Sequence, residues 1–462
     1  MNHKMIPTPW PLAFLAGALV VGSCLAQSPV KPTGPGPAKV EVRQVDGRWR
    51  LYVNDQPFFI KGAGLEFGDQ EKLAAAGGNS FRTWSTWNGR ETGQQVLDRA
   101  LKYGLFVTMG LDVASERHGF DYSDTNAVAR QLARIKAQVL KYKDHPALLM
   151  WDIGNELNFG SHNPKVWNAV NDISRMIHQV DPNHPTTTSL AGISKDLVDE
   201  IRLRASDLDL LSIQSYADIV NLPRELRESG WNGPYVVTEW GATGHWECDK
   251  TGWDAPIEDN SSVKARLYLK RYQTAIAADR KQCLGSYVFL WGQKEERTPT
   301  WYGMFLKNGD ETEVVDVMQY LWTGYWPKFR SPQLEGFWLD GNNAHQNVHL
   351  DVGQSYPARV RAQSPNHEPL RYTWKIMEES RAQSTGGDFE APPPSLPGLV
   401  TQDPAGEAQV KAPSKPGAYR LYVYVFDDKG HAAYANIPFY VNRTDDTRVA
   451  AAPNIGQSNG KQ

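Results

Sequence analysis

The chain has 462 residues, a length typical of two or three domains. Its contents of 40% hydrophobic and 22% charged residues are ordinary for a folded globular protein. The formal net charge of −3 gives no electrostatic reason to expect nucleic acid or an anionic membrane as a partner. The 16 tryptophans and 19 tyrosines stand out. Most should pack in cores, but aromatic rings also stack on the C–H faces of sugars.

The N-terminus predicts an export signal over residues 1–26, because Pro11–Val21 is an apolar stretch too short to be a comfortable membrane span. Val21-Gly22-Ser23-Cys24 resembles a bacterial lipoprotein box, which implies a signal of residues 1–23 and a lipid anchor on Cys24. Cleavage after Ala26 would instead release a soluble secreted protein. We favour the lipoprotein, periplasmic or at the cell surface, because a lone cysteine at this position is otherwise unexplained. Residues 27–39, rich in Pro and Gly, then form a linker.

Residues 40–330 alternate strand-like and helix-like segments after a predicted hairpin over 40–60. Eight short apolar runs are predicted strands: Phe58–Gly62, Ser80–Trp84, Phe106–Leu111, Leu148–Ile153, Thr186–Leu190, Leu210–Gln214, Tyr235–Thr238 and Ser286–Trp291. Helical periodicity lies between and after them, over Gln94–Tyr103, Asn126–Tyr142, Val166–Val180, Lys195–Arg204, Leu222–Ser229, Ser262–Arg280 and Glu313–Leu321. The pattern predicts an α/β fold, a (β/α)8 TIM barrel. An open doubly wound sheet is the alternative, but no Gly-rich phosphate loop follows an early strand.

The composition changes after Arg330. Residues 331–442 have short alternating runs and many prolines, and they predict a small all-β sandwich. Tyr372-Thr373-Trp374 and the stretch from Pro416 to Val423 resemble an immunoglobulin-like domain of the polycystic-kidney-disease type. Its expected role is a spacer, with glycan binding as the less favoured alternative. Residues 443–462 are polar and predicted to be disordered.

Two glutamates stand at the ends of predicted strands. Glu156 follows the fourth apolar run, directly after Asn155, and Glu239 ends the seventh. In an α/β barrel the carboxyl ends of the strands carry the chemistry. Two carboxylates on one such rim are the minimal machinery for breaking a glycosidic bond.

The motifs Trp151-Asp152-Ile153-Gly154-Asn155-Glu156 and Thr238-Glu239-Trp240-Gly241 resemble those of retaining glycoside hydrolases of clan A. The likeness spans about residues 40–326 and is greatest to the catalytic barrel of family 2, with some likeness to β-1,3-glucanosyltransferase barrels. It implies that Glu156 is the general acid/base and Glu239 the nucleophile. It also implies that Asn155 binds the sugar 2-hydroxyl and that Arg82 and Tyr216 hold the nucleophile. No cofactor and no metal are implied.

Aromatic residues are further candidates for substrate contact. By the same resemblance, Trp291 is the floor of the sugar subsite, and Trp84, Trp240 and Trp301 support the site. Other candidates on predicted rim loops are Trp87, Asp112, His245, Trp246, Glu247, Lys294, Arg297 and Tyr302.

The chain departs from family 2 in its domain order, because only a hairpin precedes the barrel where those enzymes usually carry β-sandwich domains. This favours cleavage inside a β-linked poly- or oligosaccharide over exo-acting galactosidase or glucuronidase specificity. The expected function is therefore a retaining β-glycoside hydrolase, and we expect a monomer. A transglycosylase of the same mechanism and a non-catalytic glycan-binding envelope lipoprotein are the alternatives. Cys248 and Cys283 are either a disulfide or two free thiols.

Overall fold

The computed structural model describes residues 30–443. The predicted export signal, the lipidation site Cys24 and the tail from residue 444 lie outside these residues. Residues 31–443 belong to one compact unit. The first described strands, β1 (Val40–Val45), β2 (Arg48–Val53) and β3 (Gln56–Phe58), form a small antiparallel sheet.

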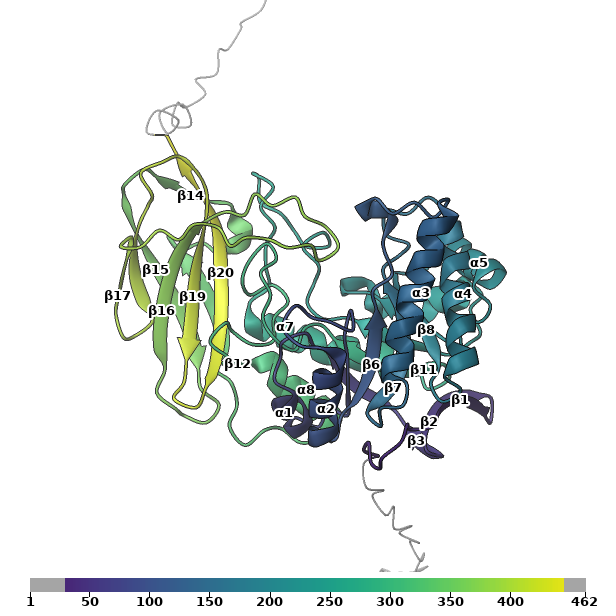
Figure 1. The fold of residues 1–462 in the computed structure, drawn as a ribbon. Coiled ribbons are helices and arrows are strands. Elements are labelled where there is room, and N and C mark those ends of the chain that lie inside the picture. The colour runs from purple at the N-terminus through teal and green to yellow at the C-terminus, as the bar shows by residue number, and fades with distance from the viewer. Residues whose placement is uncertain (1–29, 444–462) are drawn as a thin grey trace, which may run out of the picture. The chain divides into compact units, whose positions relative to one another are not determined.

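Eight parallel strands close into a barrel in the order β10-β11-β4-β5-β6-β7-β8-β9 (Figure 1). Their bounds are β4 Ile60–Gly64, β5 Ser80–Arg82, β6 Phe106–Leu111, β7 Leu148–Asn155, β8 Thr186–Ala191, β9 Leu211–Gln214, β10 Tyr235–Glu239 and β11 Cys283–Val288. The predicted TIM barrel is thus confirmed. Glu156 directly follows the fourth barrel strand, and Glu239 is the last residue of the seventh.

The strands read as continuous apolar runs because both of their faces are buried, one by the barrel interior and one by helices. The interior is filled by side chains such as Tyr287, whose hydroxyl lies 2.9 Å from Ser80 Oγ and 2.6 Å from Thr108 Oγ1. Its ring lies against Gly62, where a Cβ would approach to 2.4 Å. Gly62 is therefore required by close packing inside the barrel.

Helices alternate with the strands, and most begin at an Asp, Asn, Ser or Thr whose side chain accepts from the first free backbone N–H groups. They are α1 Gln70–Ala75, α2 Gly93–Tyr103, α3 Thr125–Tyr142, α4 Lys165–Val180, α5 Lys195–Arg204, α6 Leu222–Glu228, α7 Ser261–Arg271 and α8 Glu313–Thr323. Short 3₁₀ turns cover Glu116–His118, Ala217–Asn221 and Ala344–Gln346, and a π-helical turn covers Tyr272–Ile276.

Three elements differ from the prediction by more than a shift of one or two residues at an end. Helix α1 was not predicted, because six residues are too short to show helical periodicity. Helix α7 ends at Arg271 and passes into the π-helical turn, so the regular helix is shorter than the predicted 262–280. Strand β11 begins and ends three residues before the predicted Ser286–Trp291. The last shift moves Trp291 off the strand and changes its surroundings, as described below.

The C-terminal part is built of β-strands in two sheets. Their bounds are β12 Glu311–Thr312, β13 Gln333–Leu339, β14 Val348–Asp351, β15 Ser355–Gln363, β16 Arg371–Glu378, β17 Val400–Gln402, β18 Glu407–Lys411, β19 Gly417–Phe426 and β20 His431–Asn442. One sheet has the order β12-β20-β19-β16, with β14 also pairing β20, and the other β13-β15-β18-β17. Their main pairings are antiparallel, and apolar side chains of both sheets share one core.

Buried polar side chains link α7 and the loop before it to the C-terminal sheets. The Lys264 ammonium donates to Glu258 at 2.6 Å and to the Tyr434 hydroxyl at 3.1 Å. Arg420 on β19 donates to Glu379 at 2.7 Å and to the Pro256 carbonyl at 2.8 Å. Because each charge is paired out of contact with water, truncating one partner would leave the other unpaired and costly.

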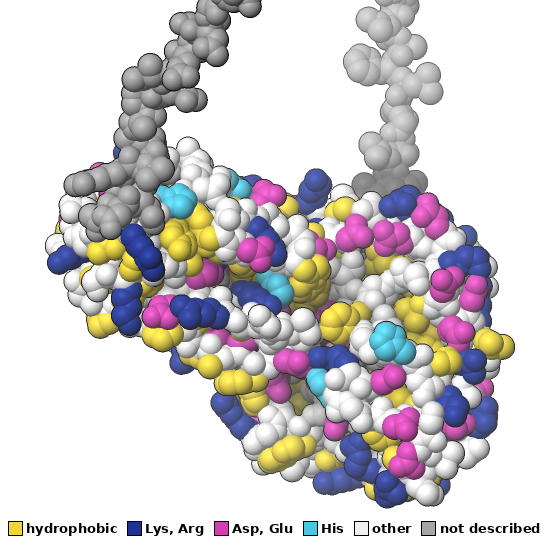
Figure 2. All heavy atoms as spheres, turned by 90° about the horizontal axis from the view of Figure 1, so that it is seen from above, with side chains coloured by type: hydrophobic (Ala, Val, Ile, Leu, Met, Phe, Trp, Pro, Cys, Tyr) yellow, Lys and Arg dark blue, Asp and Glu magenta, His cyan; other side chains and the backbone are white. Residues whose placement is uncertain are grey.

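Cys248 and Cys283 are both free thiols, so the disulfide alternative is wrong. Between residues 30 and 443, no helix combines the length and apolarity needed to cross a membrane. The face seen in Figure 2 has acidic, basic and hydrophobic side chains interspersed, without one dominant sign of charge. This distribution matches the nearly neutral composition.

Candidate active site

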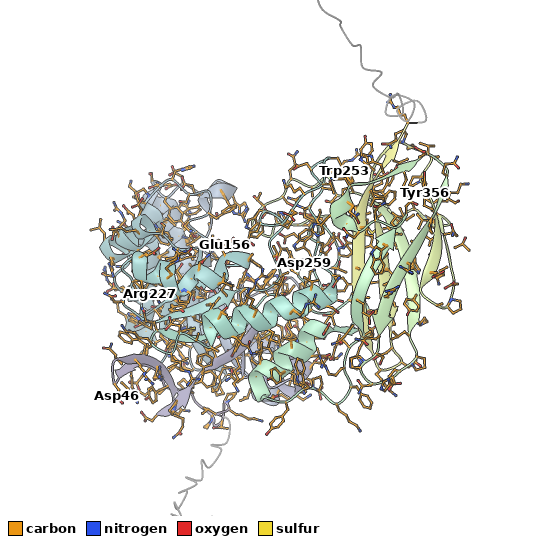
Figure 3. The ribbon with its side chains drawn as sticks, turned by 180° about the vertical axis from the view of Figure 1, so that it is seen from behind. Asp46, Glu156, Arg227, Trp253, Asp259 and Tyr356 are labelled. Atoms are coloured by element: carbon orange, nitrogen blue, oxygen red, sulfur yellow. The ribbon has the colours of Figure 1, made fainter. Side chains whose placement is uncertain are left out.

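The turn after β7 presents Glu156 at the carboxyl end of the barrel, in the upper half of Figure 3. The pairing of β7 with β8 shifts in register between Asp152 and Asn155, and Glu156 has a left-handed φ of 50°. A non-glycine residue seldom adopts this conformation, and such strain is concentrated at functional sites. The backbone N–H of Glu156 donates to the Ser189 carbonyl at 2.8 Å, which fixes the turn to β8.

Asn158 holds the other side of this turn. Its amide donates to the Ala191 carbonyl at 2.8 Å, and its side-chain oxygen accepts from the Ala191 N–H at 3.0 Å. The pair of bonds mimics a short stretch of strand pairing between the turn and the end of β8. The sequence analysis missed Asn158, although an asparagine two residues after a strand-end glutamate is a recognisable turn signal.

Glu239 receives three hydrogen bonds on its carboxylate. Arg82 Nη1 donates to Oε1 at 3.1 Å, and Trp84 Nε1 donates to the same oxygen at 3.0 Å. The Tyr216 hydroxyl donates to Oε2 at 2.9 Å. A guanidinium and two further donors stabilise the ionised carboxylate and aim it in one direction. The structure thus brings Arg82, Trp84 and Tyr216 onto Glu239.

Arg82 also joins the two halves of the site. Its Nη2 donates to Asn155 Oδ1 at 2.8 Å, and the same nitrogen lies 3.5 Å from Asp152 Oδ2. Gln214 Nε2 donates to Asn155 Oδ1 at 2.7 Å. Asn155 therefore has its oxygen occupied by Arg82 and Gln214, which leaves its amide N–H groups for another acceptor. Asp152 was missed, although an acid within an apolar strand run signals a buried partner of opposite charge.

Glu156 has a different environment from Glu239. Among the described residues, no side chain makes a hydrogen bond to its carboxyl group. Its pKa is raised to about 7, chiefly by burial and then by the nearby Glu239 carboxylate, against the opposing effects of Arg82 and Arg117. Near neutral pH, Glu156 can therefore hold a proton.

Aromatic side chains surround Tyr216. Its ring makes edge contacts with Trp246 at 5.5 Å, with Tyr302 at 5.4 Å and with Phe289 at 6.1 Å between centroids. Phe289 follows β11 and also contacts Trp84 at 5.9 Å. The sequence analysis did not single out Phe289, because the strand end was placed three residues too late.

Three tryptophans do not reach the site as predicted. Trp291 has no exposed surface, packs edge-on against Phe305 and at a tilt against Trp322, and donates to the Asp69 carbonyl. Trp240 is equally buried, against Tyr268 and Tyr272, because it points to the opposite face of the chain from Glu239. Trp301 is 1% exposed and donates to the Thr243 carbonyl at 2.8 Å. None of them can touch a substrate here, so Trp291 as a sugar floor is wrong.

Three other residues that were predicted to lie on rim loops have different surroundings. Trp87 is 55% exposed and lines, with Glu66 and Trp84, a small hollow of about 20 Å³. Glu247 instead accepts from the backbone N–H groups of Ala217, Asp218 and Gly244, and so holds the loop after Tyr216. Asp112 is exposed and pairs with Arg134, away from the glutamates.

Comparisons with known proteins agree with this architecture. Residues 69–246 match the family described as "Glycosyl hydrolases family 2, TIM barrel domain". A stretch of 62 residues is 40% identical to mannan endo-1,4-beta-mannosidase F of Aspergillus clavatus, over 13% of this chain and 14% of that protein.

Solved structures resemble the chain at low identity. A beta-glucuronidase of Bifidobacterium dentium has a TM-score of 0.48 at 16% identity, over 62% of this chain and 49% of that one. A family 5 mannosidase of Rhizomucor miehei has a TM-score of 0.44 at 16% identity, over 60% of this chain and 96% of that one. The chain thus spans only about one seventh of the mannosidase F and about half of the glucuronidase.

The closed parallel barrel and the match over residues 69–246 show a TIM-barrel domain that is similar to that of glycosyl hydrolase family 2. The matched residues run from before β5 to after β10 and include both Glu156 and Glu239.

Replacing Trp84 by Phe should lower kcat by about 10- to 100-fold, the effect of removing one donor to a charged group. The phenyl ring keeps the contact with Phe289, while the bond to Glu239 Oε1 is lost. Trp301→Phe is the matched control, because it loses an indole bond to a backbone carbonyl instead. It should lower the melting temperature without a comparable change in kcat. Equal kcat losses in both variants would contradict a specific role for Trp84.

Proposed function

We propose that the protein is a retaining β-glycoside hydrolase that cleaves O-glycosidic bonds in a β-linked poly- or oligosaccharide. Glu156 serves as general acid/base and Glu239 as nucleophile. The observation that carries the proposal is the contrast between the two carboxyl groups: that of the half-buried Glu156 accepts no hydrogen bond from a described residue, and that of Glu239 accepts three. Environments that separate two acids in this way assign the protonated and the ionised role.

In the first step, Glu156 gives its proton to the glycosidic oxygen while Glu239 attacks the anomeric carbon. The bond to the leaving sugar breaks, and a glycosyl ester forms on Glu239. As negative charge leaves Glu239, its mutual repulsion with Glu156 disappears. Proton transfer from Glu156 and bond formation at Glu239 therefore assist each other.

In the second step, the ionised Glu156 takes a proton from water, and the resulting hydroxide equivalent displaces Glu239 from the anomeric carbon. Glu156 thereby regains its proton and Glu239 its negative charge, and the product keeps the β configuration. The amide N–H groups of Asn155 donate to no described residue and can donate to a sugar hydroxyl, because Arg82 and Gln214 already occupy the Asn155 side-chain oxygen. Hydrogen bonds to the sugar 2-hydroxyl strengthen in the transition state of this reaction.

The proposal is tested by product analysis on soluble β-mannan, β-glucan, β-galactan and β-xylan, together with 4-nitrophenyl β-glycosides. Mannan comes first in this panel because the similar stretch belongs to a mannan-cleaving relative. We expect at least one substrate to yield products whose new reducing ends are β when first formed, observed by NMR. Products first formed in the α configuration would contradict the retaining mechanism, and a panel without any cleavage would count against the proposed activity.

A further inference from the structure

Residues 379–394 leave the C-terminal sheets between β16 and β17 and return to the same strand; we call this segment the strap. Its ends are joined, because the Glu378 N–H donates to the Pro394 carbonyl at 3.1 Å and the Leu396 N–H to the Ile376 carbonyl at 2.9 Å. Its first residue, Glu379, is held by the buried Arg420. The strap is thus a loop whose two ends are fixed to the C-terminal sheets, so that its middle part can hold a defined position away from them.

One part of the strap is bound to the loop that follows β11, the eighth barrel strand. The Arg297 guanidinium donates to the Ala382 carbonyl, and to the Ser384 carbonyl at 2.9 Å. The backbone N–H of Arg297 donates to Glu390 Oε2 at 2.7 Å. Lys294 Nζ donates to the Gly387 carbonyl at 2.9 Å. Arg297 in particular engages both the outgoing and the returning side of the strap.

The tip of the strap is bound to the loop that follows β6, the third barrel strand. Arg117 donates from its two terminal nitrogens to the two carboxylate oxygens of Asp388, at 3.0 Å and 3.1 Å. A Cβ added to Gly386 would lie 3.1 Å from Arg117 and 3.3 Å from Phe159, which follows β7. A bidentate pair of this kind fixes orientation as well as distance.

Two glycines shape the tip. Gly386 and Gly387 have φ values of 59° and 76°, and the Asp388 N–H donates back to the Thr385 carbonyl at 3.3 Å. Consecutive left-handed residues make a tight turn that glycine adopts without strain. The turn lets the strap approach Arg117 and Lys294 with its backbone.

The barrel order shows where the strap lies on the rim. Strands β11, β4, β5 and β6 are consecutive neighbours, and the strap joins the loop after β11 to the loop after β6. It therefore bridges the rim segment that belongs to β4 and β5. The hollow lined by Glu66, Trp84 and Trp87 belongs to that segment. Among the contacts of the described residues, none joins the strap to the loops after β8 and β9.

The strap is also connected to both proposed catalytic groups. Arg117, which it binds, helps to lower the pKa of Glu156 against the effect of burial. Lys294, which it also binds, lies 5.8 Å from the ring of Phe289, one of the aromatic residues around Tyr216. The two side chains that the strap binds, Arg117 and Lys294, are therefore each neighbours of the site.

We propose that the strap closes the active-site rim over β4 and β5, so that a bound sugar chain extends only toward β8 and β9. The enzyme then cleaves near a chain end and not inside the chain. This inference rests on the proposed glycosidase function, and it reverses the preference for internal cleavage that domain order alone suggested. The C-terminal sheets, through the strap, take part in substrate selection and are more than a spacer.

The test compares wild type with the double variant Asp388→Ala/Glu390→Ala, which removes the strap's carboxylate bonds to Arg117 and Arg297. Gly398→Ala is the control, because Gly398 also has a left-handed φ but no atom within 4 Å of an added Cβ. The polysaccharide from the panel that wild type cleaves is the substrate. Viscosity loss is measured per new reducing end, and hydrolysis of a 4-nitrophenyl β-glycoside gives the basal activity.

Wild type and Gly398→Ala should release short products with little viscosity loss. The double variant should lose viscosity about tenfold faster per reducing end, a change of the size with which a pocket contact discriminates substrates. Aryl-glycoside hydrolysis within severalfold of wild type shows that the double variant is folded. Internal cleavage by wild type, or an unchanged ratio in the double variant, would overturn the inference while leaving the glycosidase function intact.

If no substrate is cleaved, the proposed function fails first, and hydrogen exchange then decides whether the strap is docked. Amides of residues 382–390 should exchange more slowly in wild type than in the double variant. Equal exchange in the two proteins would overturn the closed rim independently of activity.

Discussion

Replacement of Glu239 by Gln is expected to lower kcat by about 10⁴-fold or more on every substrate, the typical result of removing a nucleophile. Gln has nearly the same shape, and its oxygen can still accept from Arg82 and Trp84. The loss therefore reports the missing negative charge and not a disrupted site. The measurement is steady-state kinetics with the best aryl glycoside, beside a melting curve that verifies folding.

The role of Glu239 has a direct chemical readout as well. An activated 2-deoxy-2-fluoro glycoside should inactivate wild type by leaving a stable glycosyl ester, and mass spectrometry should locate the ester on the peptide that contains Glu239. Glu335→Gln, a change on an exposed position of β13, should leave both kinetics and labelling unchanged. Full activity of Glu239→Gln, or a label on another residue, would refute the assignment.

For Glu156, the expected result is a loss of activity as the pH rises through about 7. The first step requires the protonated acid, and burial together with Glu239 holds the pKa of Glu156 at about 7. Below that pH the acid keeps its proton, and above it the proton is lost, so kcat/KM should fall on the alkaline side. In Glu156→Gln, the residual kcat/KM should no longer fall on the alkaline side. A wild-type profile that stays flat to pH 9 would contradict the acid role.

Glu156→Ala separates the two functions of this residue. Substrates with poor leaving groups should lose about 10²- to 10⁴-fold in kcat, the usual contribution of general acid catalysis. Activated aryl glycosides should lose less in the first step, because their leaving groups need no proton. Azide should restore their turnover by taking the place of the base-activated water, and the product should be a β-glycosyl azide. An α-azide would rule out the double displacement.

The barrel and the positions of both glutamates could be predicted from the sequence for one physical reason. Strands buried on both faces are continuous apolar runs, and such runs end where polar groups meet solvent at the rim. Glu156 and Glu239 mark two of those ends, and Asn155 beside Glu156 marks a turn. Arg82, by contrast, was indicated by the resemblance to clan A barrels and not by the apolar pattern of its strand.

The aromatic residues show what such patterns cannot determine. Strand β11 ends three residues earlier than predicted, so Phe289 and not Trp291 lies at the rim. An apolar run in the sequence does not specify the last residue of its strand to within three residues. Trp240 and Glu239 are neighbours in the chain, yet alternation along the strand buries one against Tyr268 and leaves the other at the site. Residue type and proximity in sequence therefore do not decide which side chain faces the substrate.

The sequence by itself determined the strands, their order and the two acids, because local burial patterns and strand ends encode these features. Only the tertiary structure decided which donors converge on Glu239, since Arg82, Trp84 and Tyr216 come from loops and strands more than 20 residues apart from it. It alone also decided that a strap from the C-terminal sheets meets Arg117, 271 residues before Asp388. Contacts at that separation depend on how whole elements pack, and no local pattern records them.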